Sequence, residues 1–249
     1  MEKGLIKKPK LRSYLFMALY EYFGMVLFLV GINCSGNDAS VASLGLFVAA
    51  TLTGRVSGGH FNMAITFAVY VMEGKFRKNF SIALIVMIID ILGAFTAMVI
   101  SAGLLGSKNI FLLIPPGELN NLTTSYFLYL LLVEAFFTMI FVSTVLSVKY
   151  RRVSATSDGM LSNLTVAISA YVVIRMAGPL SGGGLNPTIA LACITTGSIV
   201  YGGQDDSGKV VSPVFLFPYM IGPLLGGLMA AGLQKLSERI AEDEEDQIR

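Results

Sequence analysis

Two glycine-rich segments of this chain each end in an asparagine, and these asparagines are the polar residues with the clearest chemical use. The first segment is SGGHFN over residues 57–62, and the second is SGGGLN over residues 181–186. An asparagine before an apolar run is a helix N-cap signal, and Pro187 suits the first position of a helix. Each asparagine would then place an amide donor at the positive end of a short helix. Between long apolar segments, such interrupted helices are typical of channels and transporters.

The composition indicates that membrane helices position these asparagines. Of the 249 residues, 54% are hydrophobic and 14% are charged, which is too apolar for an ordinary soluble domain. About 20 helical residues cross a hydrocarbon core. Six apolar stretches approach or exceed this length, the second being short: 14–33, 39–54, 80–104, 125–148, 160–178 and 213–234. The first is too long for a cleaved signal peptide and holds Glu21, so we expect it to remain in the mature protein.

Basic residues fall on one side of these predicted spans. They are Lys3, Lys7, Lys8, Lys10 and Arg12, then Lys75, Arg77 and Lys78, and finally Lys149, Arg151 and Arg152. The positive-inside rule makes that side cytoplasmic, so both termini of this multi-pass protein are expected in the cytoplasm. The net charge of +2 follows from this bias, and no nucleic-acid partner is needed to explain it. The plasma membrane is the default location, and an organelle membrane is the alternative.

The chain also carries an internal repeat. EYFGMVLF at residues 21–28 resembles EAFFTMIF at 134–141, with three predicted spans between the copies. An odd number of spans gives the two halves opposite orientations, which is an inverted repeat. We expect one domain over 1–249, with halves at about 13–105 and 124–236 and cytoplasmic tails at 1–12 and 237–249. Small residues near Gly93 and within IGPLLGG at 221–227 would let helices approach closely.

Together these features resemble the aquaporin, or major intrinsic protein, family along almost the whole chain. The resemblance rests on the two asparagine loops, the paired glutamates that begin the repeated segments, and YMIGP at 219–223. It implies an all-α membrane protein with six transmembrane helices and two re-entrant half-helices in an inverted repeat. It also implies a homotetramer in the lipid bilayer, passive permeation of water and small neutral solutes through each subunit, and no cofactor. The sequence shows no nucleophile with its base, phosphate loop or metal cluster, so we expect neither an enzyme nor a metal site.

The resemblance assigns a role to each residue of the expected pore. The central motifs would be Asn62, Met63 and Ala64 in the first loop and Asn186, Pro187 and Thr188 in the second. Their amide donors and half-helix dipoles would exclude cations and protons. Carbonyl groups would form a ladder along Gly58, Gly59, His60, Phe61, Gly182, Gly184 and Leu185. Glu21 and Glu134 would hold loop N–H groups as a scaffold, with a proton relay as the alternative.

The chain departs from the family pattern at several pore positions. Met63 replaces the usual proline and Thr188 the usual alanine, and both changes are mild. The larger departure is Ile189, where water channels carry the arginine of the outer selectivity filter, and Ala190 replaces the aspartate of glycerol facilitators. By resemblance, the filter consists of Ala42 or Leu44 with Ile174, Gly183 and Ile189. This apolar filter predicts either a wide aperture for glycerol, urea, ammonia or hydrogen peroxide, or a hydrophobic gate.

Rival functions belong to other classes of membrane protein. An energised secondary transporter also uses inverted repeats and broken helices, but its coupling ion would need intramembrane carboxylates beyond the two scaffold glutamates. A non-conducting structural or junction protein would fit the apolar filter.

Isolated polar residues and the two cysteines give further predictions. Arg175, in the fifth span, is expected to snorkel outward, and His60 is expected to be a satisfied loop residue rather than a pH sensor. Asp90 stands where the family often has glutamine and is expected to be structural. Cys34 and Cys193 predict neither a disulfide nor a metal site.

Short patterns mark three possible modification sites. Ser154 follows two arginines in an expected cytoplasmic loop and resembles a site for basophilic kinases. Asn33 and Asn121 fit the N-glycosylation pattern on the expected outer face.

Overall fold

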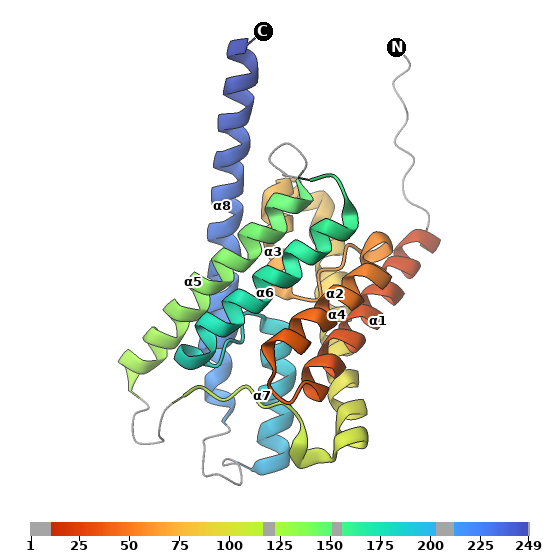
Figure 1. The fold of residues 1–249 in the computed structure, drawn as a ribbon, viewed down its shortest axis with the longest axis vertical. Helices are drawn as coiled ribbons and strands as arrows, with labels where there is room; N and C mark the ends of the chain where they lie inside the picture. Colours follow the sequence, from red (N-terminus) through yellow and green to blue (C-terminus); the bar gives the residue numbers. More distant parts are fainter. Residues whose placement is uncertain (1–10, 117–122, 151–155, 203–211, 249) are drawn as a thin grey trace.

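The computed structural model of the chain describes residues 11–116, 123–150, 156–202 and 212–248, and these residues form an all-helical bundle (Figure 1). Its α-helices are α1 (Leu11–Cys34), α2 (Ala39–Ser57), α3 (Met63–Glu73), α4 (Phe76–Leu105), α5 (Thr124–Lys149), α6 (Gly159–Ser181), α7 (Pro187–Tyr201) and α8 (Leu216–Ile248). Two 3₁₀ turns, η1 (Ser107–Asn109) and η3 (Pro213–Phe215), join them.

Six helices within the described residues are long and apolar enough to cross a membrane. They coincide with the six predicted spans, and α2 reaches 19 residues, so the span predicted to be short is long enough. Helices α3 and α7 have only 11 and 15 residues and begin at the two asparagine loops, as the half-helix prediction requires. The last helix continues through the predicted acidic tail to Ile248 and projects beyond the bundle (Figure 1).

The helix ends follow local sequence signals. Asn62 and Asn186 have extended backbones and cap α3 and α7, while Asp38 caps α2 through the backbone N–H groups of Ser40 and Val41. At the other end of α2, Gly58 has a φ of 104°, and Gly182 ends α6 with a φ of 87°. This left-handed conformation is accessible to glycine at little cost, so both long helices stop just before a loop turns back into the bundle.

Small residues set the closest helix contacts. A Cβ atom at Gly226 would lie 2.4 Å from the carbonyl oxygen of Ala135, so α8 packs directly on the α5 backbone. A Cβ atom at Gly93 would lie 3.0 Å from the carbonyl oxygen of Tyr22, which brings α4 against α1. The two helix pairs occupy corresponding places in the two halves of the repeat. Close glycine contacts of this kind are common where membrane helices pack.

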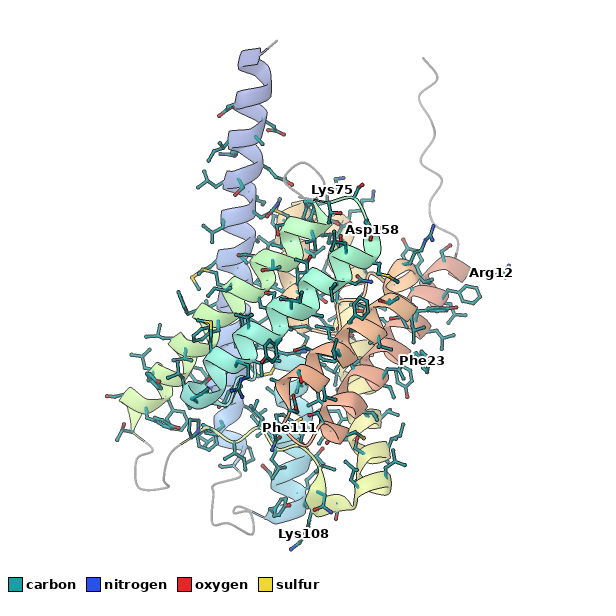
Figure 2. All side chains as sticks on the ribbon, viewed as in Figure 1. Arg12, Phe23, Lys75, Lys108, Phe111 and Asp158 are labelled. Carbon is teal, nitrogen blue, oxygen red and sulfur yellow. The ribbon has the colours of Figure 1, made fainter. Side chains whose placement is uncertain are left out.

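Basic residues that the sequence places on one side of the membrane lie towards one end of the bundle. Figure 2 shows Arg12 and Lys75 towards the end from which the C-terminal helix projects, and Lys108 at the opposite end. Helix α3 lies in the half with Lys75, and α7 lies in the half with Lys108 (Figure 1). The two short helices therefore enter from opposite ends and contact each other near the middle of the bundle.

Candidate functional site

The two asparagines meet where α3 and α7 begin, and each is fixed by the opposite loop. Asn62 Nδ2 donates to the carbonyl of Leu185 at 3.0 Å, and Asn186 Nδ2 donates to the carbonyl of Phe61 at 2.8 Å. Each side-chain oxygen accepts from its own helix, at 2.8 Å from Ala64 N and 2.9 Å from Thr188 N. An amide nitrogen has two hydrogens, so one donor on each asparagine is free of these contacts, and both residues line the central cavity.

Two buried glutamates hold the loops in place. Glu21 on α1 accepts from the backbone N–H groups of Gly59, His60 and Phe61 at 3.2, 2.6 and 2.9 Å. Glu134 on α5 accepts from the N–H groups of Gly184 and Leu185 at 3.0 and 2.6 Å and from Ser181 Oγ at 2.6 Å. These contacts satisfy backbone donors that no helix can satisfy at this depth.

The loop backbones take conformations that are unusual for residues with a side chain, and most loop residues line the cavity. Phe61 and Leu185 have φ angles of 47° and 51°, values that are uncommon for residues with a side chain. The cavity is lined by Gly58, Gly59, His60, Gly182, Gly183, Gly184 and Leu185. Phe61 is fully buried and is not among the lining residues, because its ring packs beside Gly24 and its carbonyl binds Asn186.

The two departures in the central motifs contact each other. The backbone N–H of Met63 donates to Thr188 Oγ1 at 3.1 Å, and both residues are buried. A proline at position 63 would have no N–H, and an alanine at position 188 would have no acceptor. Met63 therefore introduces a backbone N–H donor, and Thr188 supplies its acceptor. This contact could not be predicted from either motif alone.

A cavity of about 820 Å³ runs beside both loops. It touches Asp38 and Lys108 at one end, and Lys149 and Asn163 at the other. The positions expected to form the filter line it: Ala42, Ile174, Gly183 and Ile189. Leu44, the alternative to Ala42, is 56% exposed on the outside of α2. Of the two candidates, only Ala42 can therefore contact a solute in the cavity.

The end of the cavity near Lys108 carries opposite charges. Arg175 is exposed and lies at this end together with Asp38, and its predicted outward direction stays a prediction. Ser40 Oγ and the N–H groups of Ser40 and Val41 donate to the Asp38 carboxylate and lower its pKa, and the charge of Arg175 adds to this effect. Asp38 therefore stays ionised at neutral pH.

At the opposite end of the cavity, near Lys149, His60 joins a chain of hydrogen bonds. Lys149 Nζ lies 3.1 Å from His60 Nε2, and because an ammonium group only donates, this ring nitrogen is the acceptor. His60 Nδ1 then carries the hydrogen and donates to Thr66 Oγ1 at 3.0 Å, and Thr66 donates to the carbonyl of Asn62 at 3.3 Å. His60 is thus satisfied, as expected for a loop residue. Lys149 was counted only as an orientation charge, and no local pattern pointed to this contact.

The remaining predicted residues have separate surroundings. Asp90 is fully buried in α4, and neither carboxyl oxygen has a hydrogen-bond partner among the described residues.

Asn33 lies in the last turn of α1, where it is 5% exposed and bonded to Leu29 and Phe111, so it does not suit glycosylation. Ser154 and Asn121 lie outside the described residues. Cys34 is exposed and Cys193 is buried, and the described part of the chain holds no group of metal-binding side chains.

Comparisons with known proteins identify one family of membrane proteins. The model of the family described as "Major intrinsic protein" matches residues 19–233. "Aquaporin PIP2-4" of Zea mays is 26% identical over 214 residues, which cover 80% of this chain and 68% of the relative. "Glycerol uptake facilitator protein-like 6" of Lactiplantibacillus plantarum is 28% identical over 198 residues, which cover 76% of this chain and 78% of the relative.

Two further matches differ in coverage. "Aquaporin-2" of Botryotinia fuckeliana is 27% identical over 184 residues, which cover 73% of this chain but only 42% of the relative, so the match spans about two fifths of that protein. The X-ray structure of the aquaglyceroporin from Plasmodium falciparum superposes with a TM-score of 0.71 at 16% identity. The match covers 92% of this chain and 99% of that chain, and at this identity it shows a shared fold.

Proposed function

Because this chain belongs to the major intrinsic protein family, whose members are passive channels rather than enzymes, we propose that it conducts water and small neutral solutes across a membrane. The observation that carries the proposal is the reciprocal pair of hydrogen bonds by which Asn62 and Asn186 fix each other's loops at the wall of one cavity. Each asparagine retains an amide hydrogen for a passing solute, while the glycine-rich loops supply acceptors.

The proposed solutes are uncharged molecules up to the size of glycerol or urea. Ala42 and Gly183 contribute little side-chain volume at the filter level, and Ile174 and Ile189 add only apolar surface. The isoleucine at 189 provides no side-chain donor to hold a single water molecule there. A small polyol suits such a wall, because its hydroxyl groups can bind loop carbonyls while its carbon side contacts isoleucine. The names of the relatives, which include aquaporins and a glycerol uptake facilitator, agree with this range.

Cation exclusion is proposed to arise at the centre of the pore. Helices α3 and α7 both begin there, so the partial positive charges of two helix N-termini meet at Asn62 and Asn186. A cation would lose its hydration near these positive ends and find amide donors rather than acceptors. Neutral solutes do not meet this electrostatic barrier.

The structure gives less support to the rival functions. The cavity touches residues of both ends of the bundle, which favours an open pore over a hydrophobic gate or a purely structural role. The carboxylates of Glu21 and Glu134 are occupied by loop N–H groups, which leaves them poorly placed to bind a coupling ion. We further propose a homotetramer with cytoplasmic termini. The exposed apolar side chains of the membrane helices would contact lipid and neighbouring subunits, among them Leu19, Val48 and Leu132.

Liposome flux measurements test the proposal. Proteoliposomes should shrink rapidly after an impermeant osmotic shock and re-swell rapidly in glycerol or urea gradients, without dependence on a proton or sodium gradient. Ile189→Arg should narrow the filter and reduce glycerol flux about tenfold while water flux persists. Control-like rates for every solute, from protein shown to be folded, would refute a channel function. Flux that follows an ion gradient would instead indicate a secondary transporter.

A further inference from the structure

The inner end of the pore carries a positive charge that the function proposed above does not use. Lys149 is the last residue of α5, and its side chain lines the cavity on the side opposite Ile189 and the outer filter. Its Nζ is held 3.1 Å from His60 Nε2, in the loop that precedes Asn62. Lys149 is exposed at this end of the cavity, and the contact with His60 holds its amino group beside the loop.

The hydrogen-bond chain behind Lys149 explains why its position is defined. His60 presents a lone pair at Nε2 because its Nδ1 hydrogen is directed to Thr66 Oγ1, and Thr66 in turn donates to the carbonyl of Asn62. Three hydrogen bonds thus connect Lys149 to the backbone of Asn62. His60 is thus a positioning residue that links the lysine to the start of α3, where the central asparagine lies.

The charged groups around Lys149 do not cancel its charge within the cavity. The acidic groups that act on it are Glu73, at the exposed end of α3, and Glu21. Glu21 is fully buried and directs both carboxyl oxygens to loop N–H groups, so its charge is shared with those donors. Glu73 is in the last turn of α3, away from the cavity lining. The ammonium group can therefore act on a cation in this end of the cavity.

We propose that Lys149 is a specificity-determining residue of this channel, a fixed positive charge that repels cations at the inner end of a pore whose outer filter has isoleucine at position 189. The inference rests on the proposed channel function and adds a residue to it. In a narrow pore with low-dielectric walls, a single fixed charge acts strongly on ions and weakly on neutral molecules. Removal of the charge should therefore change ion permeability without a comparable change in water or glycerol permeability.

The test compares charge variants in proteoliposomes, with potassium and methylammonium fluxes measured beside water and glycerol fluxes. Lys149→Met should raise cation permeability about tenfold and change neutral fluxes less than twofold. Lys149→Arg should keep the barrier because it keeps the charge. Lys75→Met is the matched control, since Lys75 is an exposed lysine at the same end that does not line the cavity. Its cation permeability should equal that of the unmodified protein.

A chemical rescue separates charge from folding. In a Cys34→Ser/Lys149→Cys protein, 2-aminoethyl methanethiosulfonate should restore a cationic side chain and the cation barrier, whereas methyl methanethiosulfonate should not. Cys193 is buried and should not react. Equal cation permeability before and after the charge is restored would overturn the inference. So would a large rise in neutral flux alone, which would make Lys149 a steric plug. A complete lack of neutral flux in the unmodified protein would instead overturn the proposed function, while the cation comparison would still decide the role of Lys149.

Discussion

The contact between Met63 and Thr188 predicts that the two departures from the family motifs depend on each other. Thr188→Val keeps the shape of the side chain but leaves the Met63 N–H without its 3.1 Å acceptor. Met63 is 7% exposed and Thr188 is fully buried, so water cannot replace the lost partner. A buried donor left unpaired costs about 1–3 kcal/mol, and we expect the free energy of unfolding to fall by about 2 kcal/mol.

Thr188→Val should not lower the free energy of unfolding in this way when residue 63 is proline. Met63 is the first residue of α3, where proline is favoured, and Asn62 has φ −160° and ψ 118°, which a residue before proline readily adopts. Met63→Pro removes the N–H, so Thr188→Val in that background leaves no donor unsatisfied. The variant Met63→Pro alone loses buried methionine packing, and the double-mutant cycle removes this contribution from the comparison.

Unfolding titrations in mixed detergent–SDS micelles measure the four proteins of this cycle. The double variant should be more stable than the sum of the single changes predicts, by a coupling free energy of about 1–2 kcal/mol. Thr195→Val is a control, because Thr195 lies on the same helix and makes no contact with Met63 in the described hydrogen bonds. Additive single effects, within about 0.5 kcal/mol, would refute the reasoning.

Two further predictions concern helix packing and capping. Gly226→Ala should destabilise the protein by about 1–3 kcal/mol, because the new Cβ would lie 2.4 Å from the Ala135 carbonyl oxygen, while Gly232→Ala, with open space around its Cβ, should be neutral or stabilising in the same SDS titration. Asp38→Ala should remove the cap of α2 and lower stability at neutral pH. The folded-state pKa of Asp38 is lowered by its bonds to Ser40 and Val41, so this stabilisation is present above the ordinary carboxyl pKa and is lost as the pH falls through the folded value. Asp38→Ala should therefore differ from the unmodified protein at pH 7 but converge with it in acid, and a constant difference at all pH values would contradict the assignment.

The architecture was predictable because its determinants are local and repeated. Long apolar stretches specify membrane helices, and each asparagine loop specifies a helix start from its own few residues. The predicted stretch 80–104 became α4 over Phe76–Leu105, because the helix includes the polar residues Arg77, Lys78 and Asn79 before its apolar core. Gly106, with a φ of 86°, ends this helix.

Two contacts at the site, each between residues far apart in the sequence, were not predictable from local sequence patterns. Lys149 and His60 are 89 residues apart, and Met63 and Thr188 are 125 apart, so only the folded bundle brings each pair together. Arg175 was expected outside the pore because its neighbour Ile174 faces inward. The structure adds that the exposed Arg175 lies at the cavity mouth with Asp38, a residue 137 positions earlier in the chain.

The distribution of charge along the cavity indicates how selection in this pore can differ from selection in a pore whose filter contains an arginine. Such a filter places a strong donor and a positive charge at the same point, so it selects for size and for charge together. Here Ile189 contributes an apolar side chain at the expected filter, while charged residues lie at the ends of the cavity, with Arg175, Asp38 and Lys108 at one end and Lys149 at the other. Size selection and charge selection then depend on different residues. Substitutions at Ile189 should therefore change the permeability to neutral solutes, whereas substitutions that remove the charge of Lys149 should mainly change the permeability to cations.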